Sequence, residues 1–304
     1  NTNDYLQKLQ EVIAPKLAAH SDAIYLNEKL FQKVESVYNN RANLRMDAED
    51  TRLLDKYYTD FVMAGARLSA ADKARLKKLN EENALKSATF TNKLLAGTKA
   101  GQLVVNSEAE LKGLSAEEIN AAVQKAQESG FKDKLVVALI NTTQQPALTY
   151  LQNRNTRENL FSNSWTRTEK NDSNDTRATI LELARIRAEK AKILGYKNYA
   201  AWVLQDQMAK NSENVMNFLQ KLNGSAVKIA QSEAKEIQQE IHSKGEKFEL
   251  QPWDWNYYAE IVRKKKYDLD ENDIKPYFDA DSVLIKGAFF AANKLYGISF
   301  KPRN

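Results

Sequence analysis

The stretch Asp47–Leu68, DAEDTRLLDKYYTDFVMAGARL, decides the fold class of this chain. Its apolar residues recur on one side of a helix, and they are Leu53, Leu54, Tyr57, Tyr58, Phe61 and Val62. A second helix starts directly afterwards, because Ser69-x-x-Asp72 is a variant capping box that opens an apolar-periodic run to about Ala96. The pattern predicts long amphipathic helices.

The same signals continue along the chain. Ser115-x-x-Glu118 is a full capping box, and Gly130 closes the helix that it opens. Two short β-branched runs, Gln102–Asn106 and Leu135–Ile140, have the character of strands and are expected to pair as an antiparallel ribbon beside that helix. The predicted fold class is all-α: a helical array with one small antiparallel β ribbon. Further helices are expected at residues 4–19, 22–43, 146–168, 173–194, 198–209, 212–243, 254–266 and 281–296.

Composition agrees with this class. The 304 residues include only 10 Gly and 5 Pro, which favours long helices over a turn-rich β fold. The net charge of +5 comes from basic residues scattered along the chain, so no nucleic-acid partner is expected. The one basic run, Arg263–Lys266 beside Tyr267, has the composition to touch phosphate or an acidic surface, although a solvated helix end is the favoured interpretation.

The chain has no cysteine, which excludes disulfides, thiolate metal sites and cysteine nucleophiles. No apolar run approaches the length of about 20 residues that spans a bilayer. The polar start Asn1–Asp4 has no initiating Met, and we expect it to be a boundary inside a longer protein. The compartment is left open between cytoplasm and periplasm.

Segments in the second half of the chain resemble one family. They are NTTQQPAL at Asn141–Leu148, NRNTRE at Asn153–Glu158, SWTRTEKND at Ser164–Asp172, ARIRAEKAKILGY at Ala184–Tyr196, YAAW at Tyr199–Trp202, QMA at Gln207–Ala209, PWDWNYYAE at Pro252–Glu260, YDLDE at Tyr267–Glu271, IKPYF at Ile274–Phe278 and AANKLYG at Ala291–Gly297. In this order they are similar to the M3 zinc metallopeptidases, the family of the bacterial dipeptidyl carboxypeptidases, oligopeptidase A and thimet oligopeptidase. Residues 1–140 match in pattern but less diagnostically.

The resemblance implies a zinc peptidase that removes dipeptides from the free C-terminus of short, unfolded peptides, with mostly helical lobes around a channel. The family's His-Glu-x-x-His zinc motif is not in this sequence, whose two histidines are His20 and His242. Residues 1–304 are therefore expected to form one helical lobe, with the zinc-binding region downstream of residue 304. A subdivision of the lobe near residues 100–145 is left open. No catalytic or metal-ligating residue is assigned here, substrate-binding residues stay unknown, and no zinc is expected on this part alone.

Other groupings of chemically active residues each have a structural interpretation that we favour. His242 with Glu236 and Glu240 resembles a metal cluster but fits a polar helix face, and His20 fits a helix end. Asp268-x-Asp270-x-Asn272 starts like a calcium loop, yet Asp273 stands where the loop needs glycine, Pro276 interrupts it and Asp279 replaces the closing Glu, so capping by Asp270 is preferred. The carboxylates Glu169, Asp172 and Asp175 fit a polar turn that caps the next helix.

The aromatic residues Trp253, Trp255, Tyr257, Tyr258 and Tyr267 have two interpretations. We favour core packing at the start of a helix, and peptide contact in a channel wall stays open as the alternative. For the whole chain there are two functional hypotheses. The first is that it is part of a peptidase, and the alternative is that it is a non-catalytic helical domain that binds peptides or serves as a scaffold.

Overall fold

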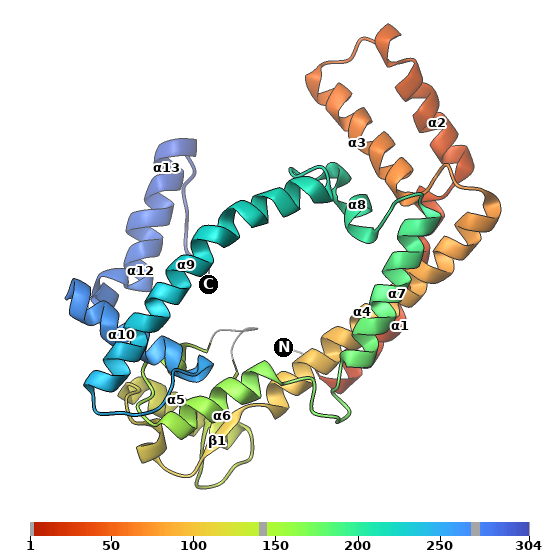
Figure 1. Ribbon diagram of the computed structural model, residues 1–304. Coiled ribbons are helices and arrows are strands. Elements are labelled where there is room, and N and C mark those ends of the chain that lie inside the picture. The colour runs from red at the N-terminus through yellow and green to blue at the C-terminus, as the bar shows by residue number, and fades with distance from the viewer. Residues whose placement is uncertain (1–2, 140–144, 269–273, 304) are drawn as a thin grey trace.

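The computed structural model describes residues 3–139, 145–268 and 274–303. Helices dominate these residues, and their strands form one two-stranded antiparallel sheet, as predicted. In Figure 1 the elements follow an arc that returns on itself around an open centre. One arm holds α1, α4 and α7, a base holds α5, α6 and β1, and a second arm of α9 and α10 runs back towards the first.

The first arm is a layer of three long helices. Helix α4 (Ala70–Ala100) packs against both α1 (Asp4–Tyr25) and α7 (Arg177–Ile193). A hairpin of α2 (Glu28–Asn39) and α3 (Ala48–Ala64) extends from one end of this layer. The hairpin has its own small core of Phe31, Phe61 and Ala66. Asp47 and Ser69 cap α3 and α4 through their side chains, as the sequence predicted for Ser69.

The base of the arc contains the largest cluster of buried apolar residues. Strand β1 (Leu103–Val105) pairs with β2 (Leu135–Val137), and Leu103 lies opposite Val137. Helix α5 (Ala116–Glu128) covers this ribbon, and both halves of its predicted capping box are present. Helix α6 (Arg154–Trp165) adds Leu160 to the core, after a single 3-10 turn, η3 (Pro146–Thr149).

The second arm leads back from α7. The short α8 (Tyr199–Val203) connects to α9 (Ser212–Ser243), whose bounds agree with the predicted 212–243. Helix α10 (Pro252–Tyr267) then packs along the C-terminal part of α9, around buried Ile237, Ile241 and Tyr258. The C-terminal elements are α12 (Ala280–Ser282), a π-helical segment η6 (Val283–Phe289) and α13 (Phe290–Tyr296).

Four predicted boundaries were wrong for identifiable reasons. Helix α1 continues through residue 20 to Tyr25, and Asn27 caps a separate α2, so the expected break near residue 20 is absent. The helix predicted at 146–168 begins only at Arg154, because the side chain of Asn153 caps α6 there. Helix α7 begins at Arg177 after a polar turn, and α8 ends at Val203 because a 3-10 turn follows it.

Candidate functional site

A fully buried carboxylate organises the junction of α6 and α10. Asp254, in the first turn of α10, is 0% exposed. Arg154 donates from Nε to Asp254 Oδ1 at 3.1 Å and from Nη2 to Oδ2 at 2.9 Å, while Arg157 Nη2 donates to Oδ1 at 2.9 Å. Two guanidinium groups thus bond to one buried carboxylate. These hydrogen bonds join charged groups, and such bonds are shorter and stronger than those between neutral groups.

Arg157 is itself 1% exposed and is held at three points. Besides the carboxylate of Asp254, its Nη1 donates to the backbone carbonyls of Leu151 and Gln152 at 2.9 and 3.0 Å. These bonds fix the segment that precedes α6 to the first turn of α10. Arg157 is therefore a structural clamp, since both terminal nitrogens bond to protein groups and the side chain, including its unpaired Nε, is buried out of a substrate's reach.

Aromatic rings surround the two guanidinium groups. The guanidinium carbon of Arg154 lies 4.0 Å from the ring centre of Phe248, and that of Arg157 lies 4.3 Å from the ring centre of Tyr257. Such contacts stabilise the pairs further. Burial raises the pKa of the Tyr258 hydroxyl, so this group ionises less readily than an exposed tyrosine.

Next to this clamp lies a groove of about 740 Å³. Its floor and walls come from η3, α6, α9 and the start of α10, and they are mainly apolar and aromatic: Leu148, Phe161, Trp165, Ala234, Leu250, Gln251, Pro252, Trp255 and Asn256. Phe161 and Trp165 stack with ring centres 5.4 Å apart, and Trp165 is 63% exposed. We call these nine residues the α10 groove.

The chemistry of the α10 groove suits binding better than catalysis. Apolar and aromatic walls with two amide side chains, Gln251 and Asn256, can accept side chains of a peptide and hydrogen-bond its backbone. The nearby carboxylate, Asp254, is fully engaged by two arginines and has no access to water. No general base or activated nucleophile therefore lies among the nine lining residues.

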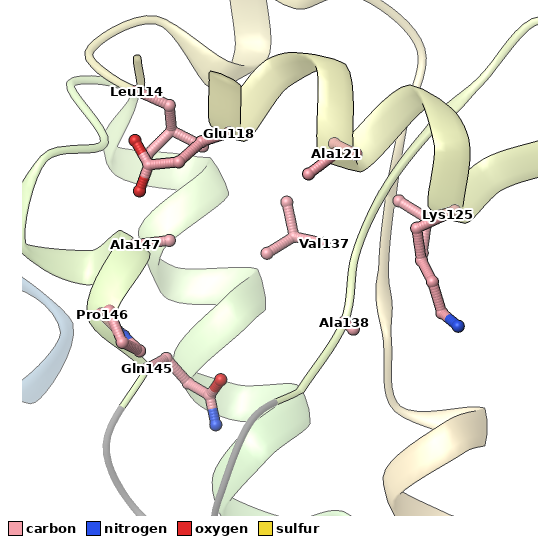
Figure 2. A pocket seen from close by; sticks show the side chains of 11 residues that line it. Leu114, Glu118, Ala121, Lys125, Val137, Ala138, Gln145, Pro146 and Ala147 are labelled. Atoms are coloured by element: carbon pink, nitrogen blue, oxygen red, sulfur yellow. The ribbon is translucent and has the colours of Figure 1, made fainter. Parts of the chain in front are cut away.

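A second cavity, of about 300 Å³, lies between α5, β2 and η3. Figure 2 shows its apolar lining from opposite sides, with Ala121 and Val137 on one side and Ala147 on the other. The charged groups at its edge are already used. The carboxylate of Glu118 accepts from the backbone N–H of Ser115 at 2.8 Å, and Lys125 pairs with Glu128 at 3.0 Å. This cavity offers apolar space without a reactive group.

His242, Glu236 and Glu240, which resemble a metal cluster in the sequence, each interact with other side chains, and a polar helix face remains the favoured interpretation. His242 Nε2 is 3.0 Å from Gln238 Nε2, while Lys266 pairs with Glu236 at 2.7 Å and Lys265 with Glu240 at 2.5 Å. His20 lies in α1 rather than at a helix end, which corrects that prediction. In residues 3–139, 145–268 and 274–303, no group of three His, Cys, Asp or Glu side chains is placed to hold a metal ion.

The carboxylates near residue 170 form the predicted polar turn. Asp175 accepts hydrogen bonds from the backbone N–H groups of Asn171 and Arg177, each at 3.0 Å. Hydrogen bonds from Arg177 hold the pKa of Asp175 well below its usual range. Asp172 accepts from the N–H of Asn174 at 2.8 Å. These groups shape the entry to α7. Thr176 occupies the cap position itself, but its side chain makes no capping bond to the helix, because its hydroxyl bonds instead to Thr168 Oγ1 at 3.1 Å.

The other candidate groups have structural roles where they are described. Asp279 caps α12 by accepting from the N–H of Ser282, and the preferred cap Asp270, with the centre of the calcium-like loop, lies outside the described residues. In the basic run, Lys265 and Lys266 bridge α10 to α9 and Arg263 pairs with Glu260 at 2.7 Å. The run thus joins two helices, which the sequence-based interpretation of a solvated helix end missed.

The aromatic residues divide between the two interpretations. Tyr258 is buried in the core, as favoured, whereas Trp255 lines the α10 groove and Tyr267 is 71% exposed. Sequence reasoning missed the clamp of Arg154, Arg157 and Asp254. The sequence did indicate the arginine half of the clamp, because Arg154 and Arg157 are three residues apart and therefore share one helix face.

Residues 147–304 match the sequence profile of peptidase family M3. Over 303 residues the chain is 48% identical to dipeptidyl carboxypeptidase from Escherichia coli K12 and 47% identical to dipeptidyl carboxypeptidase from Salmonella typhimurium LT2. These alignments cover all of the chain but 44% and 45% of the two relatives. Oligopeptidase A from Haemophilus influenzae is 25% identical over 96% of the chain, which spans 43% of that protein. The chain thus spans less than half the length of these relatives.

Proposed function

The chain belongs to peptidase family M3, and we propose that it is one part of a zinc metallopeptidase that releases dipeptides from the C-terminus of short peptides. The observation that carries the proposal is the identity of 48% with dipeptidyl carboxypeptidase along the whole chain. The expected partners of the intact protein are short, unfolded peptides. The chain itself supplies a helical lobe, with a possible subdivision near residues 100–145.

Within that function, we propose that the α10 groove forms part of the wall that contacts peptide substrates. Its aromatic lining, its two amide side chains and its lack of a reactive group support a binding role. The adjacent clamp of Arg154, Arg157 and Asp254 supports a rigid groove. It ties the first turn of α10 to α6, and these two helices contribute opposite walls of the groove.

Zinc is the cofactor that family membership implies for the intact protein. A zinc site needs three or four ligands from His, Cys, Asp or Glu. The described residues do not fit this requirement, since they hold no such group of three, and the chain's two histidines lie on different helices, α1 and α9. We therefore assign no zinc ligand and no catalytic step to the side chains described. No helix in the described ranges has the length and apolar character to cross a bilayer.

The reaction is tested with the intact protein and one peptide prepared with either a free carboxylate or an amide at its C-terminus. We expect successive dipeptides to be released from the free peptide and little product from the amidated one, because the free carboxylate is the proposed recognition point. Mass spectrometry of the products measures both. Peptide binding without cleavage would contradict the proposal and support the rival, a non-catalytic peptide-binding domain.

The role of the α10 groove is tested by Trp255→Ala in the intact protein. We expect KM to rise about tenfold, equivalent to about 1.4 kcal/mol of lost contact, with kcat little changed. The matched control is Tyr57→Ala, which removes a 50% exposed aromatic ring from α3, in the hairpin at the far end of the other arm. Equal KM values for the two variants would exclude Trp255 from substrate binding.

A further inference from the structure

The N-terminal half of α9 carries an apolar face that the described chain leaves uncovered. Val215, Leu219, Leu222, Ala226 and Ile229 follow one another at alternating spacings of four and three residues, so they lie along one side of the helix. Leu219 is 50% exposed, Leu222 is 52% exposed and Ile229 is 58% exposed. We call these five residues the α9 apolar face.

This face continues into a region that is already an interface. Further along the same helix, Ile237 and Ile241 are 2% and 0% exposed because α10 covers them. Ile237 lies on the same side of the helix as Leu219, since 18 residues make five turns at 3.6 residues per turn. One continuous apolar stripe is therefore buried at its C-terminal end and open at its N-terminal end.

The opposite side of α9 has a different composition. Lys221, Lys228 and Lys235 recur at intervals of seven residues and face away from the apolar stripe. A helix with one apolar side and one lysine side buries the first against protein and keeps the second in water. The side chains of Leu219, Leu222 and Ile229 are still half exposed, so a covering partner would remove further apolar surface from water.

We propose that the α9 apolar face is an internal interface of the intact peptidase and that it is covered by a helix from the part of the same polypeptide that lies outside residues 1–304. The proposal rests on the proposed function insofar as that function makes this chain one part of a longer protein. The relatives are more than twice as long as the matched region, since the chain covers 44% of the dipeptidyl carboxypeptidase from Escherichia coli.

Two features point to this occupant. The alternation of four and three residues is the spacing at which one helix packs along another at a small crossing angle. The open part of the stripe also runs directly into the α9–α10 interface, so a covering helix would extend a core that already exists within this polypeptide.

The test is native-state thiol labelling of the intact protein, read residue by residue by mass spectrometry. The variants are Leu222→Cys on the α9 apolar face and Lys228→Cys on the lysine side of the same helix, with Ile229→Cys as a second probe of the apolar face. We expect a maleimide to label the cysteines at 222 and 229 at least about tenfold more slowly than the cysteine at 228, because a buried thiol reacts only when its surroundings open.

Three outcomes would overturn the proposal. Equal labelling rates at 222 and 228 would show that the face is open to solvent in the intact protein. Protection at 222 that disappears on dilution would identify a second copy as the occupant. An intact gene product that ends at residue 304 would leave no segment to cover the face. Peptidase activity of the same variants is measured separately: protection without activity would contradict the proposed function alone, and activity with rapid labelling at 222 would contradict only this interface.

Discussion

Replacing Asp254 with alanine is expected to destabilise the chain by about 3–5 kcal/mol, the usual cost of removing one partner from a buried ion pair. The reason is the environment of Arg157, which is 1% exposed and loses its charged partner. Arg154 is less affected, because 32% of its side chain is exposed and its guanidinium can hydrate. The first turn of α10 also loses the carboxylate that accepts from the N–H of Gln251 at 3.3 Å.

Urea unfolding, followed by circular dichroism, measures this change. The matched control is Asp60→Ala, which breaks the exposed pair between Lys56 and Asp60 on α3 and is expected to cost no more than about 1 kcal/mol. A loss below about 1 kcal/mol for Asp254→Ala would contradict the account, since it would mean that Arg157 is hydrated or paired elsewhere.

A second variant separates the charge from the packing. Arg157→Met combined with Asp254→Leu removes the buried pair together and leaves apolar groups in its place. Because buried pairs are often replaceable by apolar residues at little cost, we expect the double variant to lose less stability than the sum of the two single variants.

Local signals in the sequence predicted much of the fold. The Ser115 and Glu118 capping box set the start of α5, and the two β-branched runs predicted the ribbon of β1 and β2. These features depend on residues within a few positions of one another, so a short stretch of sequence specifies them. The bounds of α9 followed in the same way from its uninterrupted periodicity.

The candidate site could not be predicted in this way. Arg154 and Asp254 are 100 residues apart, and only the packing of α10 on α6 brings them within 2.9 Å. The pairing of Lys266 with Glu236 likewise depends on how α10 lies along α9. The type of a single residue carries no information about such a long-range partner. The aromatic residues were recognised because they are close in the sequence, whereas the clamp of Arg154, Arg157 and Asp254 was missed because its members are not.

Zinc binding and peptide cleavage are both expected to be absent from residues 1–304 alone and present in the intact protein. The motif that would hold zinc requires two histidines four residues apart, whereas this chain has only His20 and His242. The described carboxylates near His242 are paired with lysines, which compete with a metal ion for their oxygens. Residues 1–304 alone are therefore expected to show no peptide cleavage at all, rather than cleavage at a reduced rate.

The most direct test measures zinc content and dipeptide release for purified residues 1–304 and for the intact protein, side by side and on the same peptide. The account predicts stoichiometric zinc and dipeptide release that a chelator abolishes for the intact protein, with neither property for residues 1–304. Dipeptide release by residues 1–304 alone that a chelator abolishes would contradict it.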